Sequence, residues 1–171
     1  MKGYIQVYTG NGKGKTTAAI GLSVRAVGAG RRVFFAQFAK GQIYSEIKAI
    51  QELLPNITVK QYGLECFIYG KPKQADIDSA RRGFEEVSAI IESGDYDVVV
   101  LDEANIAVYY NLFTVEELID TLKKKPEQME IIVTGRYAHE KLVEFAHLVT
   151  EMREIKHYYQ EGVQARVGIE F

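Results

Sequence analysis

The feature that most constrains this chain is a glycine-rich stretch near its start, Thr9-Gly10-Asn11-Gly12-Lys13-Gly14-Lys15-Thr16-Thr17. An apolar run, residues 4–8, precedes it, and a small-residue segment, residues 18–30, follows it. This order predicts a strand, a tight turn and the N-terminus of a helix. Glycines lack the Cβ atoms that block close approach, and the first N–H groups of a helix have no partner within it. The stretch therefore predicts a binding site for phosphate groups, and most naturally for a triphosphate.

The stretch approximates the Walker A pattern, G-x-x-x-x-G-K-[ST], which assigns roles to two of its residues. Lys15 is expected to reach the β- and γ-phosphates, and the Thr16 hydroxyl is expected to bind Mg²⁺. The rest of the predicted binding loop consists of Gly10, Asn11, Gly12, Lys13, Gly14 and Thr17. The pattern places its first glycine at Thr9, whereas the chain has its glycine at Gly10. The loop is therefore either a Walker A loop with threonine in the first glycine position or a loop shorter by one residue.

Strand-like and helix-like segments alternate along the rest of the chain. Short runs rich in β-branched or aromatic residues predict strands at residues 4–8, 32–38, 57–62, 97–101 and 129–134. Apolar residues at spacings of three and four predict one helix over residues 79–92, and a capping box at Thr114 predicts the start of another. We therefore expect one α/β domain over residues 1–171, with a mostly parallel sheet and helices on both faces, of the RecA-like P-loop NTPase type.

Ligands in such sheets bind beyond the carboxyl ends of the strands, which directs attention to the residues that follow each strand. Asp102 and Glu103 follow the most apolar strand, as a Walker B carboxylate does, and are expected to bind Mg²⁺ opposite Thr16. The competing interpretation is a solvated strand end. Arg136 follows another strand and either reaches bound phosphate or is a surface arginine, and Arg25 on the predicted loop helix is a weaker candidate for the same role. Two loops, residues 41–46 and 63–74, are predicted lids.

Composition excludes several classes of function. A formal net charge of -2 argues against a partner that binds through bulk positive charge, so no nucleic acid is expected. The single cysteine, Cys66, excludes an intrachain disulfide and the Cys-rich zinc and iron–sulfur patterns, and it favours a reducing, cytoplasmic location. No apolar run approaches the ~18 residues of a membrane span, and we find no signal peptide, so no membrane association is expected.

Several motifs together resemble one family, the P-loop ATP:corrinoid adenosyltransferases. They are GNGKGKTTAA at residues 10–19, RAVG at 25–28, QFAKG at 37–41, VVVLDE at 98–103 and VTGR at 133–136. The ending, with Lys156-His157, Gly162-Val163-x-Ala165 and Gly168-Ile169, is similar to that family's C-terminal segment. The resemblance runs nearly from end to end, and the phosphate loop that is one residue short is itself characteristic of the family.

The resemblance implies transfer of the 5′-deoxyadenosyl group of ATP to the cobalt(I) of a corrinoid, with release of triphosphate. Cobalt(I) is itself the nucleophile, so the protein must align it with C5′ of ATP and stabilise the charge on the leaving group. The family binds ATP reversed relative to other P-loop proteins. By this resemblance Lys13, Lys15, Mg²⁺ and the loop N–H groups bind the triphosphate, while Lys15 and Glu103 are catalytic.

The resemblance also implies partners and an aromatic contribution to catalysis. Phe67 and Tyr69 are expected to exclude the lower axial ligand of cobalt, which eases its reduction, although a tryptophan common in relatives is absent. Relatives often carry an N-terminal helix that helps to cover the corrinoid, whereas this chain starts at the first predicted strand. An electron donor such as a flavoprotein and a homodimer are further expectations from the family.

Two other functions remain open at the level of sequence. The same loop would serve a small P-loop nucleotide kinase or ATPase, which would release ADP instead of triphosphate. A non-catalytic, ATP-dependent corrinoid carrier would bind the same ligands without turnover.

Overall fold

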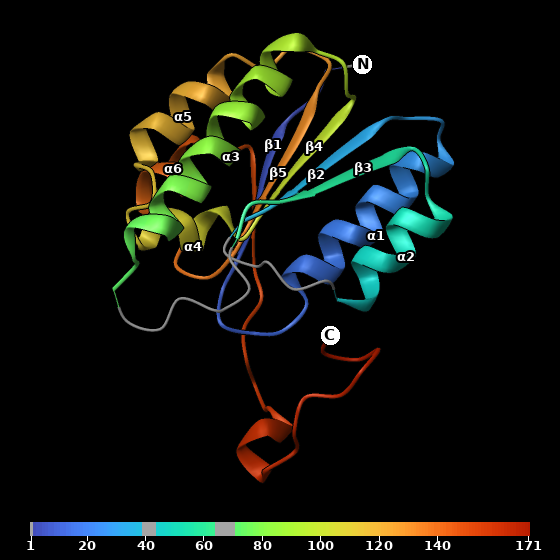
Figure 1. Cartoon of the computed structure of the whole chain (residues 1–171), viewed down its shortest axis with the longest axis vertical. Helices are drawn as coiled ribbons and strands as arrows, with labels where there is room; N and C mark the ends of the chain where they lie inside the picture. The colour runs from blue at the N-terminus through green and yellow to red at the C-terminus, as the bar shows by residue number, and fades with distance from the viewer. Residues whose placement is uncertain (1, 39–43, 64–70) are drawn as a thin grey trace.

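A computed structural model describes residues 2–38, 44–63 and 71–171 of the chain (Figure 1). The described strands form one sheet of six strands, all parallel, in the order β3-β2-β4-β5-β1-β6. Their bounds are β1 Ile5–Thr9, β2 Val33–Gln37, β3 Ile57–Gln61, β4 Val98–Asp102, β5 Glu130–Thr134 and β6 Leu148–Glu151. The helices are α1 Lys15–Gly28, α2 Ser45–Leu53, α3 Gln74–Ser93, α4 Ala104–Tyr109, α5 Val115–Lys123 and α6 Glu140–Phe145, with a 3₁₀ turn, η1, at Tyr158–Glu161.

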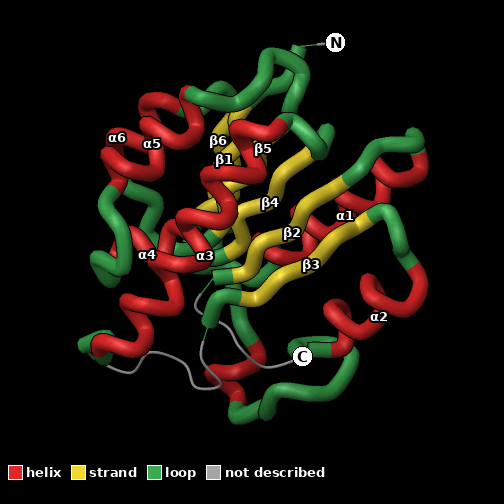
Figure 2. Tube along the Cα trace, turned by 45° about the horizontal axis from the view of Figure 1, so that its top comes forward, coloured by secondary structure: helices red, strands yellow, loops and turns green. Residues whose placement is uncertain are grey.

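Helices cover both faces of the sheet (Figures 1 and 2). On one face, α1 and α2 pack on side chains such as Phe35 and Val100, and on the other, α3 to α6 pack on Phe34, Leu101 and their neighbours. Successive residues of a strand point to opposite faces, so β2 and β4, with helices on both sides, are buried at every position. The expected doubly covered α/β fold is confirmed.

The described helices and strands differ from the predicted ones at particular places. The predicted lid at residues 41–46 is helical at its end, because α2 begins at Ser45, and the predicted lid at 63–74 ends where α3 begins at Gln74. β6 was not predicted, because it is a four-residue edge strand whose side chains are all exposed and which therefore shows no apolar run. No helix within the described ranges is long and apolar enough to cross a membrane.

Candidate active site

A pocket of about 910 Å³ opens at the carboxyl edge of the sheet, where the topology rule predicts a ligand site. Its polar walls come from the phosphate loop, the end of β4 and the end of β5. Its other walls come from the start of α2 and from the last residues of the chain. The lining residues most relevant to ligand binding are Lys13, Lys15, Thr16, Ile20, Tyr44, Ser45, Glu103, Ile106, Tyr110, Arg136, Tyr137, Ile169, Glu170 and Phe171.

The phosphate loop is the five-residue turn Gly10 to Gly14 between β1 and α1, because Thr9 belongs to the strand and pairs with Glu151 of β6. This geometry favours the shorter of the two loops that the sequence left open. The loop packs against the chain that leaves β6. A Cβ atom on Gly10 would lie 2.5 Å from Met152 O, and the Gly12 N–H donates to the same oxygen at 2.7 Å. Glycine is required at position 10 also by its φ of 95°.

Lys15 is the first residue of α1, and its side chain folds back over the loop. It is buried, and its Nζ donates to Gly10 O at 2.8 Å and to Gly12 O at 2.7 Å. The ammonium group thus lies inside the curve of the loop, beside the N-terminal turn of a 14-residue helix whose first N–H groups lack helical acceptors. This is the arrangement of charge and donors that an anionic phosphate chain requires.

Asp102, the last residue of β4, lies opposite the loop with no exposed surface. Its Oδ1 accepts from Thr16 Oγ1 at 2.9 Å and from Thr134 Oγ1 at 2.6 Å, and its Oδ2 accepts from Gln37 Nε2 at 2.9 Å. Gln37 is fixed in turn because its Oε1 accepts from Gln61 Nε2 at 2.8 Å. The hydrogen bond between Thr16 and Asp102 brings together the two halves of the predicted magnesium site.

The chemistry of these groups fits Mg²⁺, which prefers hard oxygen ligands and usually retains several waters. The buried Asp102 carboxylate is surrounded by three neutral donors, so a divalent cation nearby would compensate its charge. The Thr16 hydroxyl donates its proton to Asp102, which leaves its oxygen lone pairs for a metal ion. In the described part of the chain no three His, Cys, Asp or Glu side chains converge on one point.

Glu103 and Arg136 reach the pocket from the ends of β4 and β5. Glu103 has a φ of 59°, which is rare for a residue other than glycine, and its N–H donates to Thr134 Oγ1 at 3.1 Å. Its carboxylate passes over Gly135, where a Cβ atom would lie 3.2 Å from Glu103 Oε2. Arg136 is exposed and lines the pocket. The strained backbone at Glu103 therefore aims a carboxylate toward the same space as Arg136.

Not every predicted site residue is brought to this pocket. Arg25 lies in the last turn of α1, about 15 Å along the helix axis from Lys15 by the rise per residue, and it does not line the pocket. Its proposed contact with phosphate remains a prediction that this position does not support. Phe67 and Tyr69 lie outside the described residues, so their predicted role in the corrinoid site also remains a prediction.

Sequence reasoning missed two parts of the site. One is the support of the predicted Asp102 by Gln37, which pairs with it in register, and by Gln61, which pairs with Gln37. The other is the C-terminal segment, whose residues Gly168 to Phe171 line the pocket. The only signal for the second part was the similarity of the ending to the family, because contacts between the two ends of a chain leave no local pattern.

Comparison with known proteins identifies the family. The family model described as ATP:corrinoid adenosyltransferase BtuR/CobO/CobP matches residues 1–171. The chain belongs to this family. A corrinoid adenosyltransferase of Escherichia coli K12 is 35% identical over 171 residues, which cover 99% of this chain and 86% of that protein. Corrinoid adenosyltransferase CobA of Salmonella typhimurium LT2 is also 35% identical, with the same two coverages, and the corrinoid adenosyltransferase of Pseudomonas aeruginosa PAO1 is 32% identical, with 99% and 84% covered.

Proposed function

We propose that this chain transfers the 5′-deoxyadenosyl group of ATP to the cobalt(I) of a corrinoid and releases triphosphate. Membership of the family supports the reaction, and one structural observation supports its location. The phosphate loop, Thr16, which donates to the buried Asp102, and several aromatic side chains line one pocket of about 910 Å³, near the upper end of the usual range for ligand sites. We also infer that residues 1–171 form one P-loop domain.

The proposed step is a displacement at C5′ of ATP. Cobalt(I) supplies the electron pair of the new Co–C bond, and the C5′–O bond breaks with its electron pair on the triphosphate. No proton is transferred, so the site needs no general base. The chain's own contribution is to align C5′ with cobalt and to stabilise the anion that leaves.

Lys15 is the proposed main cation for the leaving triphosphate. Its Nζ donates to Gly10 O and Gly12 O, and a phosphate oxygen is a stronger acceptor than either carbonyl. The N-terminal amides of α1 lie beside it and add partial positive charge. Thr16, Asp102 and Glu103 are the proposed magnesium-binding residues, and bound Mg²⁺ would further neutralise the triphosphate. Arg136 is proposed to reach the phosphate chain from the end of β5.

The finer features of the family are also proposed for this chain. Phe67 and Tyr69 are proposed to displace the lower axial ligand of the corrinoid. A flavoprotein or similar electron donor is proposed because cobalt must be reduced to cobalt(I) before it reacts. A homodimer and a cytoplasmic location are proposed from the family and from the presence of a single cysteine.

Product analysis tests the proposal. Protein, ATP, Mg²⁺ and a chemically reduced corrinoid, mixed without oxygen, should give a light-sensitive Co–C product and one triphosphate for each bond formed. Lys15→Ala should lower kcat by about 100-fold or more, the scale of losing one preorganised charge-stabilising group. The matched control Lys141→Ala removes a lysine that pairs with Glu116 on the surface at 2.5 Å and should retain activity. Formation of ADP and phosphate without a Co–C bond would show a kinase or ATPase instead.

A further inference from the structure

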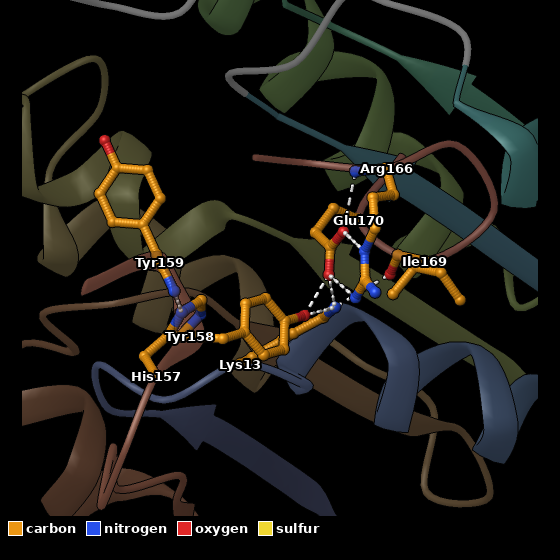
Figure 3. A network of polar contacts seen from close by, with 7 residues as sticks. All are labelled: Lys13, His157, Tyr158, Tyr159, Arg166, Ile169 and Glu170. Carbon is orange, nitrogen blue, oxygen red and sulfur yellow. Dashed lines mark hydrogen bonds and ion pairs between the residues drawn. The ribbon is translucent and has the colours of Figure 1, made fainter. Parts of the chain in front are cut away.

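Lys13, within the phosphate loop, points away from the loop and into the C-terminal segment (Figure 3). Lys13 Nζ donates to Glu170 Oε1 at 2.7 Å, to Ile169 O at 3.0 Å and to the Tyr158 hydroxyl at 3.2 Å. An ammonium group has three protons, so these three acceptors satisfy it completely. Lys15 Nζ instead donates to carbonyl oxygens of its own loop, Gly10 O at 2.8 Å and Gly12 O at 2.7 Å.

Glu170 is the centre of this network. Besides Lys13, its carboxylate accepts from the Arg166 backbone N–H at 2.8 Å, from Arg166 Nε at 3.3 Å and from the Tyr158 hydroxyl. Its side chain is only 16% exposed. The bonds from Arg166, followed by those from Lys13 and Tyr158, hold the pKa of the Glu170 carboxyl far below its usual range. Glu170 is therefore charged at neutral pH, and Lys13, whose pKa its bond to Glu170 raises, is charged there too.

The end of the same segment is attached on the far side of the pocket. Ser45 Oγ, in the first turn of α2, donates to Phe171 O at 3.1 Å, and the rings of Tyr44 and Phe171 have centroids 6.2 Å apart. The segment thus runs from the phosphate loop to α2, and Figure 2 shows the chain's end beside that helix. Ile169 and Phe171 line the pocket together with Ile20 of α1. This wall carries apolar and aromatic surface, which suits a nucleoside better than a phosphate chain.

We propose that residues 166–171 form the wall against which the adenosine moiety of ATP binds, and that Lys13 anchors this wall instead of binding triphosphate. Lys13 and Glu170 are then positioning residues that act as one unit. The proposal rests on ATP being the ligand of this pocket, as proposed above, and it assigns the adenosine end of that ligand to a part of the chain far from the loop in sequence. If Lys13 bound phosphate instead, Glu170 would be its competitor, and removing the Glu170 charge would strengthen binding.

Equilibrium binding of ATP and of inorganic triphosphate, each with Mg²⁺ and without corrinoid, separates these possibilities. The variants are Lys13→Met, Glu170→Gln and the double variant, which has the net charge of the original protein. Each single variant should weaken ATP binding by about fivefold, a typical loss for a partly exposed charged pair. The losses should not add, so the double variant should bind ATP at least as tightly as the single variant with the lower affinity. The double variant should bind inorganic triphosphate within about twofold of the original protein, because Lys15 and the loop remain. Lys13→Arg, which retains a donor for Glu170, should restore ATP affinity.

Three results would overturn the proposal: tighter ATP binding by Glu170→Gln, an unchanged ATP affinity in the double variant, or an equal loss of ATP and triphosphate affinity in the double variant. Glu161→Gln is the matched control, because it breaks the exposed Lys156–Glu161 pair, 3.1 Å long, in the same region but outside the pocket. Binding is measured without turnover, so this test is independent of product identity. Release of ADP instead of triphosphate would refute the proposed function and leave the assignment of the wall standing.

Discussion

Thr134→Val probes the hydrogen bonds that position Asp102 and Glu103, the proposed magnesium-binding carboxylates. The Thr134 side chain has no exposed surface, and its hydroxyl makes two hydrogen bonds, one donated to Asp102 Oδ1 at 2.6 Å and one accepted from the Glu103 N–H at 3.1 Å. Valine has nearly the same shape but cannot make either bond. Losing a hydrogen bond to a charged group costs about 1.5–3 kcal/mol, and leaving a buried N–H without an acceptor costs about 1–3 kcal/mol. We expect a combined loss of about 3 kcal/mol of unfolding free energy.

Urea denaturation measures this loss, and a melting curve should show it as a fall in Tm of about 6–12 °C, given about 2–4 °C per kcal/mol in a chain of this size. Thr134→Ser is the matched control, because it retains the hydroxyl and removes only a methyl group, at a cost of about 1 kcal/mol. The Mg²⁺-dependent part of ATP affinity should fall in Thr134→Val, since the Glu103 backbone loses its acceptor, and should be retained in Thr134→Ser. Equal stability of the valine and serine variants would refute the reasoning, because the two hydrogen bonds would then contribute nothing.

Two further predictions concern backbone conformation and pH. Gly10→Ala should lower the free energy of unfolding, measured by urea denaturation, more than Gly14→Ala does. Both glycines have a positive φ, so alanine at either position is strained by about 1–2 kcal/mol. The new methyl at position 10 would also lie 2.5 Å from Met152 O, whereas the nearest atom to a methyl at position 14 is Met152 Sδ at 3.6 Å. Equal losses would contradict the proposed clash. Thr114→Ala removes the cap of α5 and should cost about 1 kcal/mol at pH 7. The backbone N–H of Thr114 lowers the pKa of Glu117, so this carboxylate stabilises the fold above its unfolded pKa and the contribution disappears as pH falls through the folded pKa. The difference between Glu117→Gln and the original protein should therefore shrink from pH 7 to pH 3 in urea titrations, because the Glu117 carboxyl becomes neutral at low pH, and a constant difference would count against the capping box.

The sequence predicted the elements that local chemistry determines. The continuous apolar runs at β4 and β5 and the capping box at Thr114 each lie where they were expected, because burial on both faces and a helix N-terminus leave marks within a few residues. The same logic brought Thr16 and Asp102 together, since the carboxyl ends of parallel strands meet at one edge. The short helices α4 and α6, of six residues each, were not predicted, because six residues do not complete a periodic apolar stripe.

The unpredicted parts of the site depend on contacts between residues far apart in sequence. The sequence places Gln37 at a strand end and in a motif shared with the family, but only the register of β2 with β4 shows that its amide donates to Asp102. Glu170 is one charged residue in a polar ending, and only the folded chain places it on Lys13. A single sequence contains no pairwise information of this kind, whereas the identity of the loop residues follows from their own chemistry.

The position of β1 within the sheet determines when this enzyme can acquire its nucleotide site during synthesis. β1 pairs only with β5 and β6 among the described strands, so the first strand to be made has no neighbour until nearly the whole chain exists. In the phosphate loop that follows β1, the Gly12 N–H donates to Met152 O, and Met152 is synthesised after β6. Long-range parallel pairing of this kind is slow to form, because the intervening chain must be ordered first. A nascent chain that stops before β6 therefore has a glycine loop that lacks its contacts with β6 and Met152. ATP binding then indicates that β1 has paired with the strands near the end of the chain.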